Sequence, residues 1–285
     1  MQQTPSASPL AAGASDALFV DFDQVWLAYN EELHRQNIFA VEDINLKVKR
    51  GEFIAIVGPS GCGKSTFMKL ATGLKMPSTG KIRIDGQPVT GPLKISGMAF
   101  QAPSLLPWRT TLDNVLLPLE IVEPYRSQFK DRRKEYEERA KKLLASVGLG
   151  GMEKKFPWEL SGGMQQRASI CRALIHEPKM LLLDEPFGAL DAFTREDLWC
   201  TLRDLWEAQQ FNVILVTHDL RESVFLADTV YCMSKSPGRF VVQREITIPR
   251  TRDLEVTYTK DFSDTVLELR GHIGAMRKTG TVINQ

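Results

Sequence analysis

The amino-acid sequence predicts an α/β fold in which a parallel β core carries an antiparallel β subdomain and an inserted α-helical subdomain. Apolar and polar residues alternate over residues 18–48, which is typical of antiparallel strands with one buried face. Two short apolar runs, "KMLLLDEP" and "FNVILVTHD", flank a charged helical stretch, and this order favours two buried parallel strands joined by a crossover helix. From about residue 103 to 173 the character changes, and the stretch "YRSQFKDRRKEYEERAKKLLASVGL" is charged and helix-forming, which predicts the helical subdomain.

The composition is that of a globular protein without a membrane span of its own. Of 285 residues, 43% are hydrophobic and 25% are charged, and the net charge is +1, so we expect no nucleic-acid partner. No apolar run reaches the roughly 18 residues that cross a bilayer. The four cysteines form no CxxC pair, which favours a reducing cytoplasm. Residues 1–17 are rich in Ser, Ala and Pro, and we expect a disordered leader there.

The other elements follow in chain order. Residues 53–57, "FIAIV", predict a buried strand, and a glycine-rich loop and a helix come after it. The polar stretch "EELHRQN" at residues 31–37 predicts a loop. The stretch "GKIRIDGQPV" predicts a hairpin that turns at Asp85 and Gly86. A further helix is expected in "GGMQQRASICRALIHE", and the short tail of residues 251–285 carries one more near residues 263–276.

The stretch "VGPSGCGKST" joins the strand at 53–57 to the helix after it. Its spacing, Gly58-x-x-x-x-Gly63-Lys64-Ser65, is the phosphate-binding loop pattern. Backbone N–H groups of such a loop surround phosphate oxygens, and the helix start adds a positive dipole. Lys64 can reach the β- and γ-phosphates, and the Ser65 hydroxyl can ligate Mg²⁺. We expect a nucleoside triphosphate to be held by the whole loop: Gly58, Pro59, Ser60, Gly61, Cys62, Gly63, Lys64, Ser65 and Thr66.

Kinases, GTPases and motor ATPases all share this loop, so a second motif is needed to tell these classes apart. In "ELSGGMQQRASICRAL", Ser161 is a good helix N-cap, and Gly162 and Gly163 expose N–H groups at a helix start, which makes a second anion site. A capped helix without a ligand is the alternative. The letters "LSGGMQQR" resemble the signature sequence of ABC-transporter ATPase subunits.

This resemblance covers residues 18–250, with the helical subdomain at about 103–173. It implies a P-loop NTPase core of the RecA-like type that binds ATP and Mg²⁺. It also implies that two copies pack head to tail as a homodimer. Each ATP is then sandwiched between the phosphate-binding loop of one copy and Ser161, Gly162 and Gly163 of the other.

Further motifs appear in the order that the family has. "MLLLDEP" resembles the Walker B strand, which implies that Asp184 holds Mg²⁺ through water and that Glu185 orients and deprotonates the attacking water. His218 in "LVTHD" resembles the switch histidine that hydrogen-bonds the γ-phosphate and Glu185. Asp191 in "GALD" then contacts the other subunit. The alternatives are a solvated turn for the acid pair and a packed or surface side chain for the histidine.

Two more positions match the family around the nucleotide. Gln101 in "MAFQAPSLLPW" stands where the family has its Q-loop, which implies that it senses Mg²⁺ and the γ-phosphate. Residues 105–108, "LLPW", follow it, and the resemblance places them near the surface that contacts the membrane subunit. Tyr29 in "VWLAYN" stands where a family aromatic stacks on adenine, with an ordinary sheet residue as the alternative.

Cys62 lies inside the phosphate-binding loop. Space filling is the plain reason for a small residue there. Because a helix start can lower the pKa of a thiol, we expect alkylation of Cys62 to abolish ATP hydrolysis and bound ATP to protect the thiol.

Two stretches, "SPGRF" at residues 236–240 and "LLPWRTTLDNV", resemble the nitrate, sulfonate and taurine importer group. This implies an ATPase subunit that powers uptake of a small solute through a separate membrane permease. Its place is then the cytoplasmic face of the inner membrane, and an extracytoplasmic solute-binding protein is an indirect partner. An exporter subunit, a soluble ABC protein of DNA repair or translation, and a P-loop kinase are the alternatives.

Overall fold

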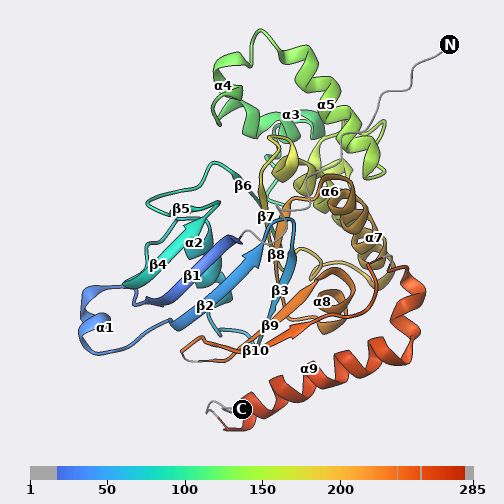
Figure 1. Cartoon of the computed structure of the whole chain (residues 1–285). Helices are drawn as coiled ribbons and strands as arrows, with labels where there is room; N and C mark the ends of the chain where they lie inside the picture. The colour runs from blue at the N-terminus through green and yellow to red at the C-terminus, as the bar shows by residue number, and fades with distance from the viewer. Residues whose placement is uncertain (1–17, 236, 251, 280–285) are drawn as a thin grey trace, which may run out of the picture.

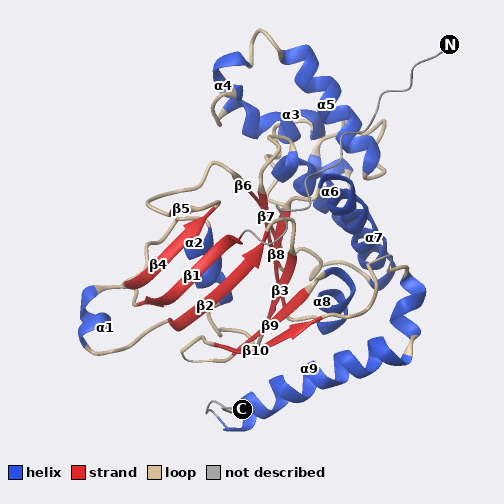
Figure 2. Cartoon of the chain, viewed as in Figure 1, coloured by secondary structure: helices blue, strands red, loops and turns tan. Residues whose placement is uncertain are grey.

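A computed structural model describes residues 18–235, 237–250 and 252–279 (Figure 1), so the predicted leader lies outside the described residues. The fold contains two β-sheets, helices that cover the larger sheet, and a helical region between β6 and β7 (Figure 2). This arrangement confirms the predicted fold class, with an antiparallel sheet, a largely parallel sheet and a cluster of helices.

The smaller sheet is antiparallel and has the strand order β2-β1-β4-β5. Its β4–β5 hairpin turns at Asp85 and Gly86, whose φ angles of +53° and +75° match a two-residue hairpin turn. The expected loop at residues 31–37 is wrong in part, because Asn30 accepts a hydrogen bond from the Leu33 N–H and caps a short helix. The elements of this sheet are β1 (Leu18–Leu27), α1 (Glu31–Arg35), β2 (Val41–Lys49), β4 (Thr79–Ile84) and β5 (Gln87–Pro88).

The larger sheet has the strand order β10-β9-β3-β8-β7-β6 and is parallel apart from the β9–β10 pair. Val57, the last residue of β3, pairs with Thr217, and Asp184 at the end of β7 pairs with Val216. The segments that follow these strands therefore leave the sheet side by side. The strands are β3 (Phe53–Val57), β6 (Ser96–Phe100), β7 (Met180–Asp184), β8 (Asn212–Thr217), β9 (Thr229–Met233) and β10 (Phe240–Glu245).

Helices cover both faces of the larger sheet. Helix α2 (Lys64–Ala71) packs between the two sheets, where Phe67 stacks on Phe22 of β1 with ring centroids 5.0 Å apart. The opposite face carries α7 (Ala192–Gln209), α8 (Leu220–Leu226) and α9 (Lys260–Thr279). The helical region between β6 and β7 contains α3 (Thr111–Leu116), η1 (Leu117–Glu120), α4 (Tyr125–Gln128), α5 (Arg133–Ser146), η2 (Pro157–Glu159) and α6 (Gly162–Leu174).

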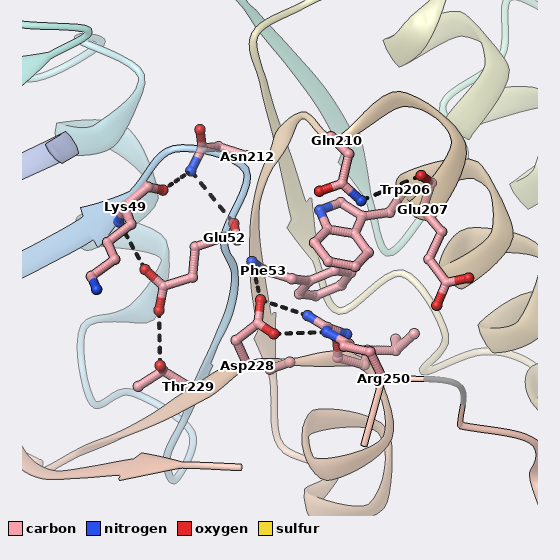
Figure 3. A network of polar contacts seen from close by, with 12 residues as sticks. Lys49, Glu52, Phe53, Trp206, Glu207, Gln210, Asn212, Asp228, Thr229 and Arg250 are labelled. Atoms are coloured by element: carbon pink, nitrogen blue, oxygen red, sulfur yellow. Dashed lines mark hydrogen bonds and ion pairs between the residues drawn. The ribbon is translucent and has the colours of Figure 1, made fainter. Parts of the chain in front are cut away.

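A polar network at the amino ends of the central strands ties the C-terminal part to the core (Figure 3). The Asp228 carboxylate accepts hydrogen bonds from the Phe53 N–H at 2.9 Å and from Arg250 Nε at 2.7 Å. The Arg250 guanidinium lies 4.1 Å from the ring centroid of Trp206, a cation–π contact. On the other side, Glu52 accepts a hydrogen bond from the Thr229 hydroxyl.

Residues 252–276 include side chains that pack into the same core. Arg252 is 1% exposed, and its Nη1 donates to the carbonyls of Val224, Phe225 and Ala227 at the end of α8. A guanidinium suits this position because the end of a helix carries unpaired carbonyls and partial negative charge. Burial lowers the pKa of Arg252 to about 10, so the side chain stays charged at neutral pH. Apolar residues of η3 (Leu254–Tyr258) and α9 complete the contact.

None of the helices in the described ranges is both long enough and apolar enough to cross a membrane.

We predict that Arg252→Met destabilises the protein by about 3 kcal/mol, because several buried carbonyls lose their donor. Urea unfolding followed by circular dichroism measures this change. Arg270→Met, on the exposed side of α9, is the matched control and should change stability by less than about 0.5 kcal/mol. Equal effects of the two substitutions would contradict the capping role of Arg252.

Candidate active site

The glycine-rich loop lies between β3 and α2, where the sequence predicts it. The Lys64 ammonium is buried and donates a hydrogen bond to the Gly58 carbonyl at 2.8 Å. This bond keeps the Lys64 side chain folded over the loop, with its ammonium group next to the first residue of the motif. The loop therefore places a positive charge and the N-terminus of α2 at one point, which suits a phosphate group.

Gly63 shows why a glycine is needed beside the lysine. Its φ angle is +105°, a conformation that other residues rarely adopt. A Cβ atom there would also lie 2.9 Å from Val41 Cγ1 and 3.1 Å from the Ala40 carbonyl oxygen. The loop packs directly against the start of β2, so the spacing of the motif reflects a steric requirement.

The acid pair and the histidine meet the loop from the neighbouring strands. Asp184 ends β7, and Glu185 follows it with a φ angle of +48°. Glu185 Oε1 lies 3.9 Å from Lys64 Nζ, and Glu185 Oε2 lies 3.2 Å from His218 Nδ1. Burial and the charge of Glu185 raise the pKa of Asp184, and Lys64 opposes them. A carboxylate that contacts a lysine and a histidine is well placed to accept a proton.

A cavity of about 810 Å³ opens over the loop and the acid pair, and its described lining does not include His218. Lys64, Gln101, Asp184 and Glu185 line it together with part of the loop: Ser60, Gly61, Gly63, Ser65 and Thr66. The described lining does not include the other three loop residues, Gly58, Pro59 and Cys62. The volume suits a nucleotide. Ser65, Gln101 and Asp184 all line this cavity. Their hydroxyl, amide and carboxylate oxygens are the ligands that Mg²⁺ prefers, so the residues fit this ion.

Tyr29 lines the same cavity near its mouth. The Tyr29 ring is 46% exposed, and its hydroxyl shares a hydrogen bond of 2.7 Å with Thr66 Oγ1. Ile38 and Phe39, which follow α1, also line the cavity, and the sequence motifs did not predict them as site residues. The signal that could have found them is the apolar "NIFA" that closes an otherwise polar stretch beside Tyr29.

The signature residues are not brought to this cavity within one copy. Ser161 caps α6, and its Oγ accepts a hydrogen bond from the Met164 N–H at 3.3 Å. Ser161 and Gly162 are exposed, and neither belongs to the described lining of the cavity. Gly163 packs so closely on α7 that a Cβ would lie 2.3 Å from Thr194 Cγ2. Asp191 is likewise outside the cavity, where it caps α7 by accepting from the Thr194 N–H.

The lowered thiol pKa on which the Cys62 expectation relied is wrong, while the effect of alkylation on hydrolysis stays a prediction. The side chain is 1% exposed and turns behind the loop, where a Cβ on Gly58 would touch its Sγ. Burial raises the pKa of the Cys62 thiol, and the nearby Lys64 only partly opposes this. A buried thiol of raised pKa is a poor nucleophile, so the desolvation outweighs the helix start on which the expectation relied.

The site also contains residues that the motifs did not indicate. Thr217, Glu222 and Arg195 surround the turn that carries His218. Glu222 is 3% exposed, and its carboxylate accepts a hydrogen bond from the Thr217 hydroxyl. No sequence pattern marks these residues as partners. Thr217 and Glu222 meet where β8 leads into α8, and Arg195 reaches the same turn from α7.

Comparison with known proteins decides the family. The model of the ABC transporter domain matches residues 41–188. This chain belongs to the ABC transporter family of ATPases. The match covers the phosphate-binding loop, Gln101, the signature and the acid pair, and the chain is an ATP-hydrolysing subunit.

Relatives in the same family include two importer subunits. The "Aliphatic sulfonates import ATP-binding protein SsuB" of Bacillus licheniformis is 44% identical over 221 residues, 77% of this chain and 83% of that protein. The "Taurine import ATP-binding protein TauB" of Yersinia pestis is 44% identical over 202 residues, 71% of this chain and 76% of that protein. A solved dimer of the ATP-binding cassette MJ0796 with ADP and Pi has a TM-score of 0.65 at 31% identity, and covers 80% of this chain and 98% of its own.

We predict that Lys64→Ala weakens ATP binding at least ~10-fold, because the substitution removes a charge-assisted contact to phosphate. Isothermal titration with ATP measures the dissociation constant. Lys81→Ala, on the exposed side of β4, is the control and should bind ATP as the unmodified protein does. An unchanged dissociation constant in a folded Lys64→Ala protein would place the nucleotide elsewhere.

Proposed function

We propose that this ATPase powers the uptake of a small anion, of the sulfonate, taurine or nitrate type, through a separate membrane permease. It acts as a homodimer at the cytoplasmic face of the inner membrane. A solute-binding protein outside the membrane delivers the cargo. The names of SsuB and TauB support the cargo class, since both are import proteins and both match most of this chain.

One observation supports the dimer most directly. Lys64 and Glu185 lie in the cavity, whereas Ser161 and Gly162 lie on the surface of the same copy. The capped start of α6 offers free N–H groups that suit a phosphate, yet its own cavity is beyond its reach. A second copy packed head to tail would bring Ser161 and Gly162 to the γ-phosphate. The dimeric MJ0796 cassette has the same fold.

The hydrolytic step follows from the contacts around Glu185. Water attacks the γ-phosphorus, the bond to the β–γ bridging oxygen breaks, and ADP and phosphate leave. Glu185 accepts the proton of the attacking water, and His218, 3.2 Å from the carboxylate, fixes its orientation. Lys64 balances charge on the phosphates. Ser65, Gln101 and Asp184 would hold Mg²⁺, which neutralises the phosphate oxygens when bound.

The surface after Gln101 is the proposed contact with the permease. Trp108 is 71% exposed, and Phe100 at the end of β6 is 42% exposed. Exposed apolar side chains of this size mark interaction sites. Because Gln101 lines the cavity while Trp108 faces outward, one short loop connects the nucleotide to this surface.

We predict that Glu185→Gln keeps ATP binding but lowers turnover at least ~100-fold, since an amide cannot accept the proton. Trapped ATP should then hold two copies together. Light scattering after gel filtration should give a dimer with ATP and a monomer with ADP. Glu207→Gln, at the exposed end of α7, should hydrolyse ATP normally. A Glu185→Gln protein that stays monomeric in saturating ATP would contradict the sandwich.

A pull-down from detergent-solubilised native membranes tests the transport role. Tagged protein should recover a multi-spanning permease, identified by mass spectrometry, and a solute-binding protein encoded beside that permease marks an importer. Trp108→Ala should lose the permease. Tyr258→Ala, which alters a comparably exposed aromatic ring on η3, should retain it. A permease without a neighbouring solute-binding protein indicates an exporter, and recovery of ribosomes or DNA-repair proteins alone would overturn the transport role.

A further inference from the structure

The loop after Glu185 and the turn at His218 are joined by one side chain. Arg195, in the first turns of α7, donates from Nη2 to the Leu190 carbonyl at 3.0 Å. Its Nη1 donates to Asp219 Oδ2 at 3.3 Å. Leu190 belongs to the segment that follows Glu185, and Asp219 is the residue after His218. A single guanidinium therefore spans the ends of the two neighbouring strands.

Asp219 is held on both of its carboxylate oxygens. Its Oδ1 accepts a hydrogen bond from the Arg221 N–H at 2.8 Å and so caps α8. Its Oδ2 accepts from Arg195. The backbone directly after His218 is thus anchored to the following helix and, through Arg195, to α7.

The residue before His218 is anchored as well. Thr217 Oγ1 accepts a hydrogen bond from the Asp219 N–H at 2.9 Å and donates its own proton to the buried Glu222 carboxyl. Burial and the charge of Asp219 raise the pKa of Glu222 well above its usual range, while Arg195 opposes them. The His218 side chain itself is 61% exposed. Its position is therefore set by the turn on which it sits, and Thr217 and Asp219 hold that turn.

We propose that Arg195 is a positioning residue for ATP hydrolysis. It joins the Leu190 carbonyl to Asp219 and so keeps His218 within hydrogen-bonding distance of Glu185. The proposal rests on the proposed function of those two residues in hydrolysis. Arg195 also connects Asp191, the neighbour of Leu190, to the turn that carries His218. A contact of Asp191 with a second copy would therefore affect the position of His218 relative to Glu185.

The test is a set of substitutions assayed for steady-state ATPase activity. Arg195→Gln should lower kcat about 10-fold, the size expected for loss of a charge-assisted hydrogen bond, and should change KM for ATP less than about two-fold. Asp219→Asn keeps the cap on α8 but loses the charge, and should have a similar effect. The double variant should be no slower than the slower single variant, because both changes break one contact.

Two further variants separate positioning from general destabilisation. Adding Arg195→Gln to His218→Ala should lower the residual kcat no further, because Arg195 acts through the histidine. Glu196→Gln breaks the outer 3.6 Å ion pair with Arg221, which joins the same two helices without touching either loop, and should leave kcat within about two-fold.

Several results would overturn the proposal: an unchanged kcat in Arg195→Gln, multiplicative losses in the Arg195→Gln/Asp219→Asn protein, or a further loss in the His218→Ala background. If Glu185→Gln and His218→Ala themselves kept full turnover, the proposed function would fail. If those two lost turnover while Arg195→Gln did not, only the positioning role would fail.

Discussion

The parallel pairing of β3, β8 and β7 is the constraint on which the rest of the molecule depends. Carboxyl ends of parallel strands meet at one edge of a sheet, so Val57, Asp184 and Thr217 finish within two strand spacings of one another. The residues that follow them then share one space. Lys64, Glu185 and His218 are brought together by the register of three buried strands, although more than 150 residues separate the first from the last.

The same constraint explains what one copy lacks. The α6 N-terminus comes from the helical region between β6 and β7, and its residues do not belong to the described lining of the cavity. Positive groups on the loop and on α6 therefore stand on different surfaces. Phosphate charge is the attraction that could join two such surfaces, and its removal by hydrolysis would release them. The binding and release of a second copy that we propose thus follow from where two helix starts lie.

The sequence predicted the parts of the site that backbone chemistry requires. Glycines at fixed spacing before a lysine, together with an acid pair at a strand end, indicate a nucleotide site, and the helix cap at Ser161 follows from local hydrogen bonding. It missed Arg195, because the contact of Arg195 with Asp219 depends on which strands are neighbours. It missed Glu222, because no residue pattern marks a buried carboxyl that pairs with the Thr217 hydroxyl. It also misjudged Cys62, since helix position is visible in a sequence and burial behind a loop is not. The helix predicted near residues 263–276 is present as part of α9. The contacts of Arg252 were not predicted, because they depend on where α8 ends.

The most direct measurement is a structure of the Glu185→Gln protein with ATP and Mg²⁺. The account predicts two copies related by a two-fold axis, with Ser161 Oγ and the Gly162 N–H of one copy hydrogen-bonded to the γ-phosphate that Lys64 of the other copy contacts. ATP held in the cavity of a single copy, with the start of α6 facing solvent in every molecule, would contradict it.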